Sequence, residues 1–228
     1  MTGWASPLLL SIRVALVSTG IVLVLGTAAA WAVVKRRWRG KGLADVLFTL
    51  PLVLPPTVTG YILLLLMASR GLFGPWLRFM GIELIFTWWA AAIASAVVAF
   101  PLMYNAAKVG FHGVDEAFEG VARTLGASES RILFTITLPL AWPGLLAGVV
   151  LSFTRALGEF GATLMVAGNI PGRTQTMPVA IYMATDAGDT KTAAVLTVIL
   201  LAFGLVAVGL SRGWSERQSG RRAGFWRS

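Results

Sequence analysis

Apolar residues in this chain gather into five long stretches without a charged residue, and polar residues are concentrated between them. The stretches cover residues 14–34, 46–69, 84–107, 132–154 and 192–211. Because roughly 20 helical residues cross hydrocarbon about 30 Å thick, each stretch predicts a membrane-spanning helix. A sixth apolar segment, 160–172, is shorter and contains glycine, asparagine and proline. That content is typical of loops, so we interpret it as a re-entrant or interfacial segment.

The composition of the 228 residues agrees with a membrane protein and excludes several other classes. Hydrophobic residues make up 57% and charged residues 13%, whereas soluble domains contain about 25% charged residues. A cytosolic enzyme is therefore excluded, and so is a disordered chain, which would be poor in apolar residues. The chain has no cysteine and one histidine, His112. This excludes a disulfide framework, a thiolate nucleophile and a metal site of cysteines or several histidines, and we interpret His112 as a surface residue.

The basic residues predict the orientation in the membrane. Thirteen of the 19 lysines and arginines lie on one side of the predicted bundle, in segments 35–41, 108–131 and 212–227, and five lie on the other. Since the side richer in Lys and Arg faces the cytoplasm, we expect the N-terminus outside and the C-terminus in the cytoplasm. The net charge of +9 then reflects topology, and no nucleic acid partner is needed. The basic run follows the first span, so we expect this span to be retained rather than cleaved.

The segment between the third and fourth spans is too long for a simple connection. Four apolar residues within it recur at helical spacing, namely Val114, Phe118, Val121 and Leu125. This pattern predicts one apolar stripe of a helix, with Glu119 and Arg123 away from the stripe. Asp115 and Glu116 suit the start of such a helix, and Gly126 suits its end. The helix is too short to cross a bilayer, so we expect it to lie along the cytoplasmic face, either alone or against a partner.

A sequence motif within this segment favours a partner. Residues 119–126 read Glu-Gly-Val-Ala-Arg-Thr-Leu-Gly. After nine intervening residues, Ile136 begins Ile-Thr-Leu-Pro. This resembles the EAA loop of binding-protein-dependent ABC importer permeases. Gly126 and the Ile-x-Leu-Pro residues match in identity and spacing, and Ala122 fills the second alanine position. Gly120 and Val121 depart from the glutamate and first alanine of that pattern.

The resemblance implies that residues 112–128 form a coupling helix seated on a cytoplasmic ATP-binding subunit. It implies coupling roles for Glu119, Ala122, Arg123, Gly126, Leu138 and Pro139. The chain contains no G-x-x-x-x-G-K-[ST] phosphate loop, so ATP and Mg are expected in the partner subunit, with no cofactor in this chain. The docking would follow the helix-in-groove mode.

Three further stretches resemble the permease subunit of molybdate uptake systems. They are Leu-Pro-Leu-Val-Leu-Pro-Pro-Thr-Val-Thr-Gly-Tyr at 50–61, Arg-Ala-Leu-Gly-Glu-Phe-Gly-Ala-Thr at 155–163 and Asn-Ile-Pro-Gly-Arg-Thr-Gln-Thr at 169–176. The resemblance implies an all-α type I importer permease of five transmembrane helices, as one domain over residues 1–228. It implies a multi-pass subunit of the bacterial or archaeal cytoplasmic (inner) membrane that imports molybdate or tungstate. The expected partners are a second copy of the chain, a dimer of ATP-binding subunits and an external solute-binding protein.

The residues also indicate where a solute could pass. Three prolines in the second span remove backbone donors and predict a kink whose carbonyls are satisfied by protein or by water in a cavity. Thr57, Thr59 and Gly60 follow the kink and are candidates to line the pathway; packing alone is the other interpretation. Tyr104 and Asn105 in the third span are weaker candidates.

Arg155 and Glu159 form an i, i+4 pair at the outer end of the fourth span. Ionisable residues at such a position usually face the interior and pair with one another. One hypothesis is that they brace the outer gate, where Glu159 prevents Arg155 from trapping a dianion. The alternative is a structural pair at the level of the lipid headgroups.

Three competing functions remain open at this point. A permease for sulfate or another small solute would share the same features. An integral membrane enzyme would need convergent acid–base or metal-binding residues within the spans, and the uncharged stretches supply none. A passive channel would have no use for a coupling helix.

Overall fold

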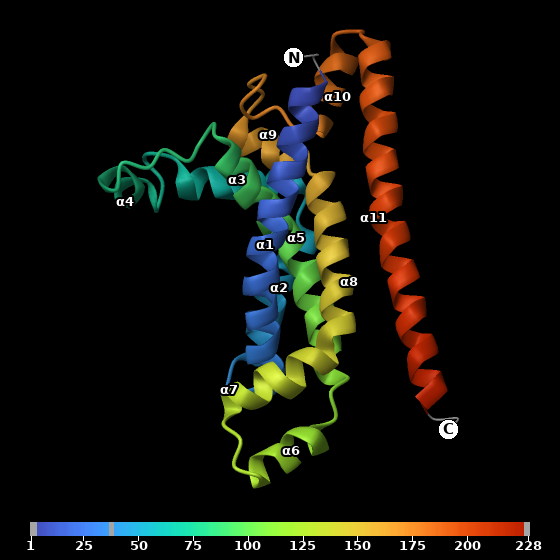
Figure 1. Cartoon of the computed structure of the whole chain (residues 1–228). Coiled ribbons are helices and arrows are strands. Elements are labelled where there is room, and N and C mark those ends of the chain that lie inside the picture. The colour runs from blue at the N-terminus through green and yellow to red at the C-terminus, as the bar shows by residue number, and fades with distance from the viewer. Residues whose placement is uncertain (1–3, 37–38, 226–228) are drawn as a thin grey trace.

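Three long helices form the centre of the structure. The computed structural model describes residues 4–36 and 39–225, and its elements are helices and loops. Helices α1 (Ala5–Lys35), α5 (Trp88–His112) and α8 (Leu138–Leu157) run side by side, with α5 packed against both others (Figure 1). Small residues allow this close packing, since a Cβ on Gly144 would lie 2.7 Å from the Cα of Gly110. The predicted first, third and fourth spans lie in these helices.

The first helix begins earlier than the apolar pattern predicts. The expected span 14–34 lies inside α1, which begins at Ala5 and therefore includes Arg13. The Arg13 guanidinium is exposed and stacks on the ring of Trp88, 3.7 Å from the ring centroid. This cation–π contact gives the guanidinium a partner without a carboxylate. The helix continues through Arg13 because arginine is a good helix former.

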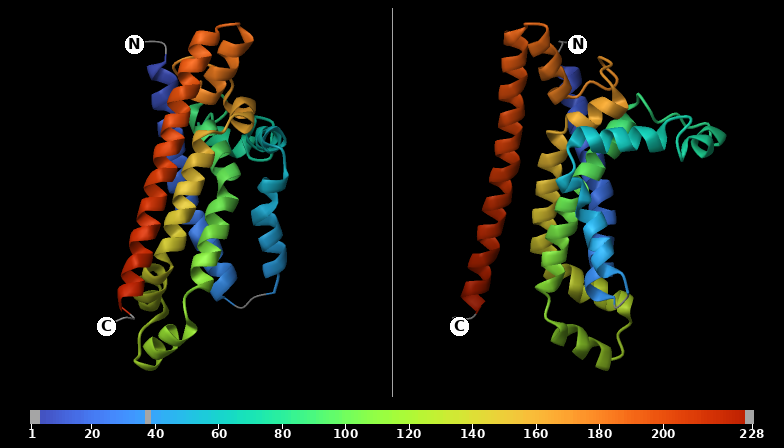
Figure 2. Two further views of the ribbon diagram at one scale, coloured as in Figure 1. Left: turned by 90° about the vertical axis from the view of Figure 1, so that its right-hand side faces the viewer. Right: turned by 180° about the vertical axis from the view of Figure 1, so that it is seen from behind.

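The predicted second span is broken rather than kinked. Helix α2 (Lys41–Val53) and helix α3 (Pro56–Met67) meet at an angle of 115°, and α3 runs across the long axis of the bundle (Figures 1 and 2). Leu54 at the break is extended (φ −75°, ψ 136°), as expected for a residue before proline. Among the described residues, four helices are long and apolar enough to span a membrane, or five if this bent pair counts as one span.

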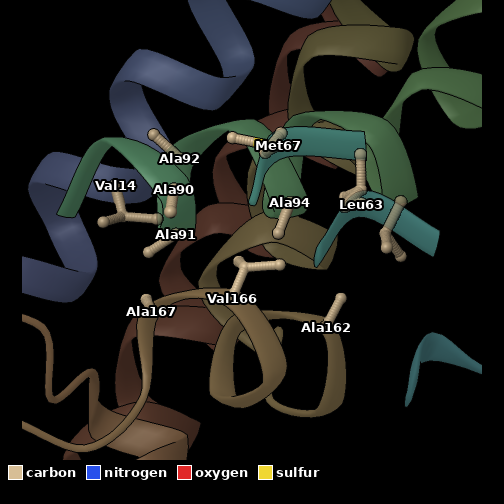
Figure 3. Packing of buried hydrophobic residues seen from close by; sticks show 11 residues of the cluster. Val14, Leu63, Met67, Ala90, Ala91, Ala92, Ala94, Ala162, Val166 and Ala167 are labelled. Atoms are coloured by element: carbon tan, nitrogen blue, oxygen red, sulfur yellow. The ribbon is translucent and has the colours of Figure 1, made fainter. Parts of the chain in front are cut away.

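Short helices lie in the half of the molecule where α1 begins. They are α4 (Gly74–Phe79), α9 (Gly161–Ala167) and α10 (Met177–Asp186). Of these, α4 projects sideways from the bundle beyond α3 (Figure 1). Helix α9 occupies the segment that the sequence assigns to a re-entrant or interfacial element, and it packs on α3 and α5. Figure 3 shows the apolar core at this junction, where Leu63 and Met67 of α3 meet Ala94 of α5 and Val166 of α9.

The last helix has little contact with the bundle. Helix α11 (Thr190–Phe225) packs on α10 and α8, and it diverges from the other helices along most of its length (Figure 1). It continues past the predicted span 192–211. Within its apolar part, Val198, Leu201 and Leu205 are exposed. This surface is available to lipid or to another chain.

The remaining short elements lie at the opposite end, where α1 and α11 terminate (Figure 1). They are α6 (Glu116–Thr124), α7 (Glu129–Ile132) and a π-helical turn, η1 (Leu133–Thr137), that continues into α8. The predicted fourth span therefore begins with a wide helical turn at the Ile-Thr-Leu-Pro motif. Turns of this kind often occur at functional sites.

Candidate coupling helix and translocation segment

Helix α6 is the helix predicted between the third and fourth spans, and both of its ends carry the predicted signals. The carboxylate of Asp115 accepts a hydrogen bond of 2.9 Å from the N–H of Ala117, which satisfies one of the free amides of the first turn. Beyond the other end, Gly126 has a φ of +82°, a left-handed conformation common after helices. The N–H of Gly126 donates to the carbonyl of Arg123 at 3.0 Å.

The apolar side of α6 faces away from the rest of the chain. Phe118, Val121 and Leu125 are 58%, 60% and 82% exposed. Val114 lies before the helix and is buried against the bundle, so the prediction of one continuous stripe is wrong at this residue. The three exposed residues form a surface that we call the apolar face of α6.

The polar side of α6 faces the bundle through Glu119, which is only 4% exposed. Its Oε1 accepts a hydrogen bond of 2.8 Å from the hydroxyl of Thr137 and lies 3.0 Å from Nζ of Lys35. Its Oε2 lies 3.7 Å from a guanidinium nitrogen of Arg123. The carboxylate therefore joins α6 to the end of α1 and to η1.

Arg123 is held from the opposite side by Glu129 of α7. Its Nε and Nη2 donate to the two carboxylate oxygens of Glu129 at 2.6 and 3.1 Å, a bidentate arrangement. This hydrogen bonding is the main reason that the pKa of Arg123 is raised. The pair closes the loop between α6 and α7.

The other predicted coupling residues are spread over this end of the molecule. Ala122 is half-buried on α6, and Gly126 is exposed. Leu138 packs on the core around Phe111, and Pro139 is exposed in the first turn of α8. Of these six, Glu119 and Arg123 form an ion pair with one another.

A polar cleft of about 510 Å³ lies between α6, the end of α1 and the η1 turn. Charged side chains of both signs line it: Lys35, Arg36, Lys41, Arg123, Glu116, Glu119 and Glu129. The Arg36 guanidinium stacks over the ring of Trp31 at 4.7 Å. The cleft lies between α6 and the bundle, and the hydrogen-bonded pair of Glu119 and Thr137 is part of its lining.

At the other end of α8, Arg155 and Glu159 are paired as the sequence suggests. A guanidinium nitrogen of Arg155 lies 2.7 Å from Oε2 of Glu159. Glu159 is 2% exposed, and its Oε1 accepts a hydrogen bond of 2.9 Å from the N–H of Ala162. The carboxylate thus caps the first turn of α9, where negative charge is favoured. It is buried inside the protein and not at a lipid-facing surface.

The candidate residues after the proline break lie against α9 as well. A Cβ on Gly60 would lie 2.7 Å from the Cα of Ala162, so the glycine is required for close packing. Thr59 is buried, and its hydroxyl has no hydrogen-bond partner among the described residues. Thr57 is exposed. The structure therefore brings the two predicted pathway segments together around the N-terminal turn of α9.

One polar cluster was not predicted from the sequence. Oδ1 of Asp45 in α2 accepts hydrogen bonds from the Tyr104 hydroxyl at 2.6 Å and from Nζ of Lys108 at 2.5 Å. Tyr104, a weak pathway candidate, is instead fully buried at this contact. The sequence did contain a signal for this ion pair, since Asp45 directly precedes the second apolar stretch and Lys108 directly follows the third. Asn105 is half-buried, and His112 is exposed as predicted.

Comparison with known proteins identifies the family. The family described as "Binding-protein-dependent transport system inner membrane component" matches residues 22–219. The chain belongs to this family. The prediction of a transport permease rather than an enzyme is confirmed, and the chain is a component of a transporter complex in a bacterial membrane.

Individual members of the family are similar over most of the chain. The chain is 48% identical to the "Putative molybdenum transport system permease protein YvgM" of Bacillus subtilis, over 87% of this chain and 88% of that protein. It is 44% identical to the "Molybdenum transport system permease protein ModB" of Escherichia coli, over 95% of each. It is 34% identical to the "Sulfate transport system permease protein CysT" of E. coli, over 94% of this chain and 76% of that one.

Solved structures of ABC importers share the fold. The chain aligns with a MetNI methionine ABC transporter in an inward-facing conformation at a TM-score of 0.72 and 14% identity, covering 94% of this chain and 95% of that one. It also aligns with a bacterial alginate ABC transporter solved with a pentasaccharide-bound periplasmic protein. The TM-score is 0.74 and the identity 14%, covering 95% of this chain and 80% of that one. These identities support the fold alone. The predicted all-α, type I importer permease fold is confirmed.

Proposed function

We propose that this chain is the permease subunit of an ATP-driven importer that moves molybdate, or tungstate, across the cytoplasmic membrane. The observation that carries the proposal is its similarity to two permeases named for molybdenum transport, at 44–48% identity over at least 87% of each chain. The sulfate permease is less similar, at 34%. Sulfate import is the second candidate.

Uptake by the reconstituted complex tests the cargo. The permease is placed in proteoliposomes with its ATP-binding subunit and binding protein, and ATP-dependent uptake of molybdate, tungstate and sulfate is compared. Molybdate or tungstate uptake that saturates at lower concentration than sulfate uptake supports the proposal. A preference for sulfate would favour the second candidate, and uptake without ATP would indicate a channel.

The proposed complex contains two copies of the permease, a dimer of ATP-binding subunits that hold ATP and Mg, and an external binding protein. Exposed apolar side chains on α2 and α11, among them Leu47, Leu201 and Leu205, support contacts with lipid and with the second copy. The described basic residues Lys35, Lys41, Lys108, Arg123 and Arg131 belong to the elements at the α6 end, which supports a cytoplasmic location for that end. The N-terminus would then be outside and the C-terminus inside.

Docking to the ATP-binding subunit is assigned to the apolar face of α6. The face is exposed, and its residues recur at the spacing of a helix seated in a groove. Ala122 and Arg123 flank the face, Gly126 ends the helix, and the turn at Leu138 and Pro139 carries motion into α8. Because the chain contains no cysteine, a single Val121→Cys variant can be cross-linked to cysteine variants of the ATP-binding subunit. Absence of any cross-link in the assembled complex would contradict this docking.

The pathway and outer gate are assigned to the junction of α3, α9 and the end of α8. Thr57, Thr59 and Gly60 meet the turn that Glu159 caps, and Arg155 is partly exposed beside it. In this proposal Glu159 neutralises Arg155, so that a dianion passing it is not trapped, in keeping with the weak contacts that conduction requires. Arg155→Ala should insert normally and reduce uptake. Normal uptake by the inserted variant would remove the gate role.

A further inference from the structure

We infer that Glu119 is a positioning residue that mechanically joins the coupling helix to the bundle, rather than a contact for the ATP-binding subunit. The inference rests on the proposed function, since it assumes that α6 receives motion from such a subunit. It concerns how that motion reaches the membrane helices. The geometry of this end of the molecule supports it in four steps.

The first step is the burial of Glu119. It is the one buried residue in α6 among those that the structure describes. The neighbouring residues Glu116, Ala117 and Phe118 are exposed. Apart from its two connecting loops, α6 is therefore held to the bundle chiefly by one carboxylate.

The second step is that both oxygens of this carboxylate already have partners within the chain. Oε1 receives the hydroxyl of Thr137 at 2.8 Å and the ammonium of Lys35 at 3.0 Å, and Oε2 faces Arg123 at 3.7 Å. The side chains of Glu119 and Lys35 are 5% and 13% exposed. Both oxygens are directed into the chain, so Glu119 is not presented to a docking protein, whereas the apolar face is.

The third step is the position of the groups that hold it. Lys35 is the last residue of α1, and Thr137 is the last residue of the η1 turn, directly before α8 begins. One carboxylate thus contacts the ends of two of the three central helices. Displacement of α6 would act on both helices at once, without any need to deform the polar cleft behind it.

The fourth step is the nature of the η1 turn. Its π-helical backbone is wider than an α-helix, and the Thr137 hydroxyl lies 3.5 Å from the carbonyl of Ile132 as well as 2.8 Å from Glu119. A hydroxyl has one proton to donate. Movement of Glu119 would therefore favour a hydrogen bond from this hydroxyl to the carbonyl of Ile132, five residues earlier. The turn offers α8 two local hydrogen-bonding arrangements.

The test separates docking from coupling in the full reconstituted complex. Glu119→Gln removes the charge, and Glu116→Gln is the matched control, because Glu116 is an exposed glutamate on the same helix that lines the same cleft. Three quantities are measured for each: membrane insertion, cross-linking of Val121→Cys to the ATP-binding subunit, and solute uptake per ATP hydrolysed. We expect Glu119→Gln to retain cross-linking and to lose at least tenfold in uptake per ATP. Glu116→Gln should remain within twofold of the parent protein in every readout.

Variants at the two partner positions keep the test informative if Glu119→Gln fails to insert. Lys35→Arg should retain uptake per ATP, whereas Lys35→Gln and Thr137→Val should reduce it several-fold with cross-linking intact. Lys35 lies on α1, away from the apolar face, so a docking role for Glu119 would not predict this pattern. Unchanged uptake per ATP in Glu119→Gln, or equal coupling in Lys35→Gln and Lys35→Arg, would overturn the inference. If the Val121→Cys variant with Glu119 intact gives no cross-link, the docking proposal has failed instead.

Discussion

Removal of the apolar face of α6 should weaken binding of the ATP-binding subunit without destabilising the permease. The double variant Phe118→Ala, Leu125→Ala removes side chains that are 58% and 82% exposed. Complete burial of such side chains contributes about 1.5–3 kcal/mol each. Scaled to the exposed fractions, docking should gain about 1–2 kcal/mol from Phe118 and about 1–2.5 kcal/mol from Leu125. The expected loss is about 2–4 kcal/mol, which corresponds to roughly 30- to 1,000-fold weaker association.

Titration of the ATP-binding subunit against detergent-solubilised permease measures this directly. Phe79→Ala is the control, since Phe79 is 90% exposed but lies on α4, far from α6 (Figure 1). The thermal unfolding midpoint of the double variant should equal that of the parent, because neither side chain is packed in the isolated chain. Association within twofold of the parent would refute the assignment of this face. A large fall in the unfolding midpoint would show that the face is packed within the permease itself.

Three further predictions concern stability. Gly60→Ala should destabilise the folded protein by about 1–3 kcal/mol, because the added Cβ would meet backbone atoms of Ala162. A lowered thermal unfolding midpoint checks this. Gly20→Ala is the control, since a Cβ on Gly20 would lie in open space. Gly126→Val should lower the free energy of unfolding by about 1–2 kcal/mol because of the positive φ at this position, and the same unfolding measurement checks it. Gly120→Ala, within α6, should instead raise that free energy by roughly 0.5–1 kcal/mol. Asp45→Asn should cost about 1 kcal/mol, because its ion pair is only partly buried. An unchanged unfolding midpoint would mean that α2 is held by other contacts, such as those of the Phe48 ring with Phe100 and Tyr104.

Features encoded within a few residues were predictable from the sequence. The start and end of α6 follow from Asp115 and Gly126, and the break between α2 and α3 follows from two consecutive prolines. Each depends on local backbone restrictions that operate in any context. The apolar stretches likewise predict the long helices, although α1 extends beyond its apolar stretch through Arg13.

Features that depend on distant residues were not predictable in this way. The prolines predict a bend but not its 115° angle, which is set by packing of Gly60 on a helix about a hundred residues later. The spacing of apolar residues places Glu119 opposite the apolar stripe, and a solvent-exposed glutamate is the ordinary expectation there. Its burial depends on Lys35 and Thr137, which only the folded chain brings to it.

The two buried glutamates give α8 a defined role between the ends of the molecule. At one end Glu119 holds the turn that leads into α8 through Thr137, and at the other Glu159 follows the helix and caps α9. The 20 residues of α8 span about 30 Å at a rise of 1.5 Å per residue. A helix packed along α5 and α1 transmits displacement far better than a loop, because its interior is close-packed and resists compression. In the proposed coupling, motion of α6 would therefore be expressed at the α3–α9 junction, where the candidate gate residues lie.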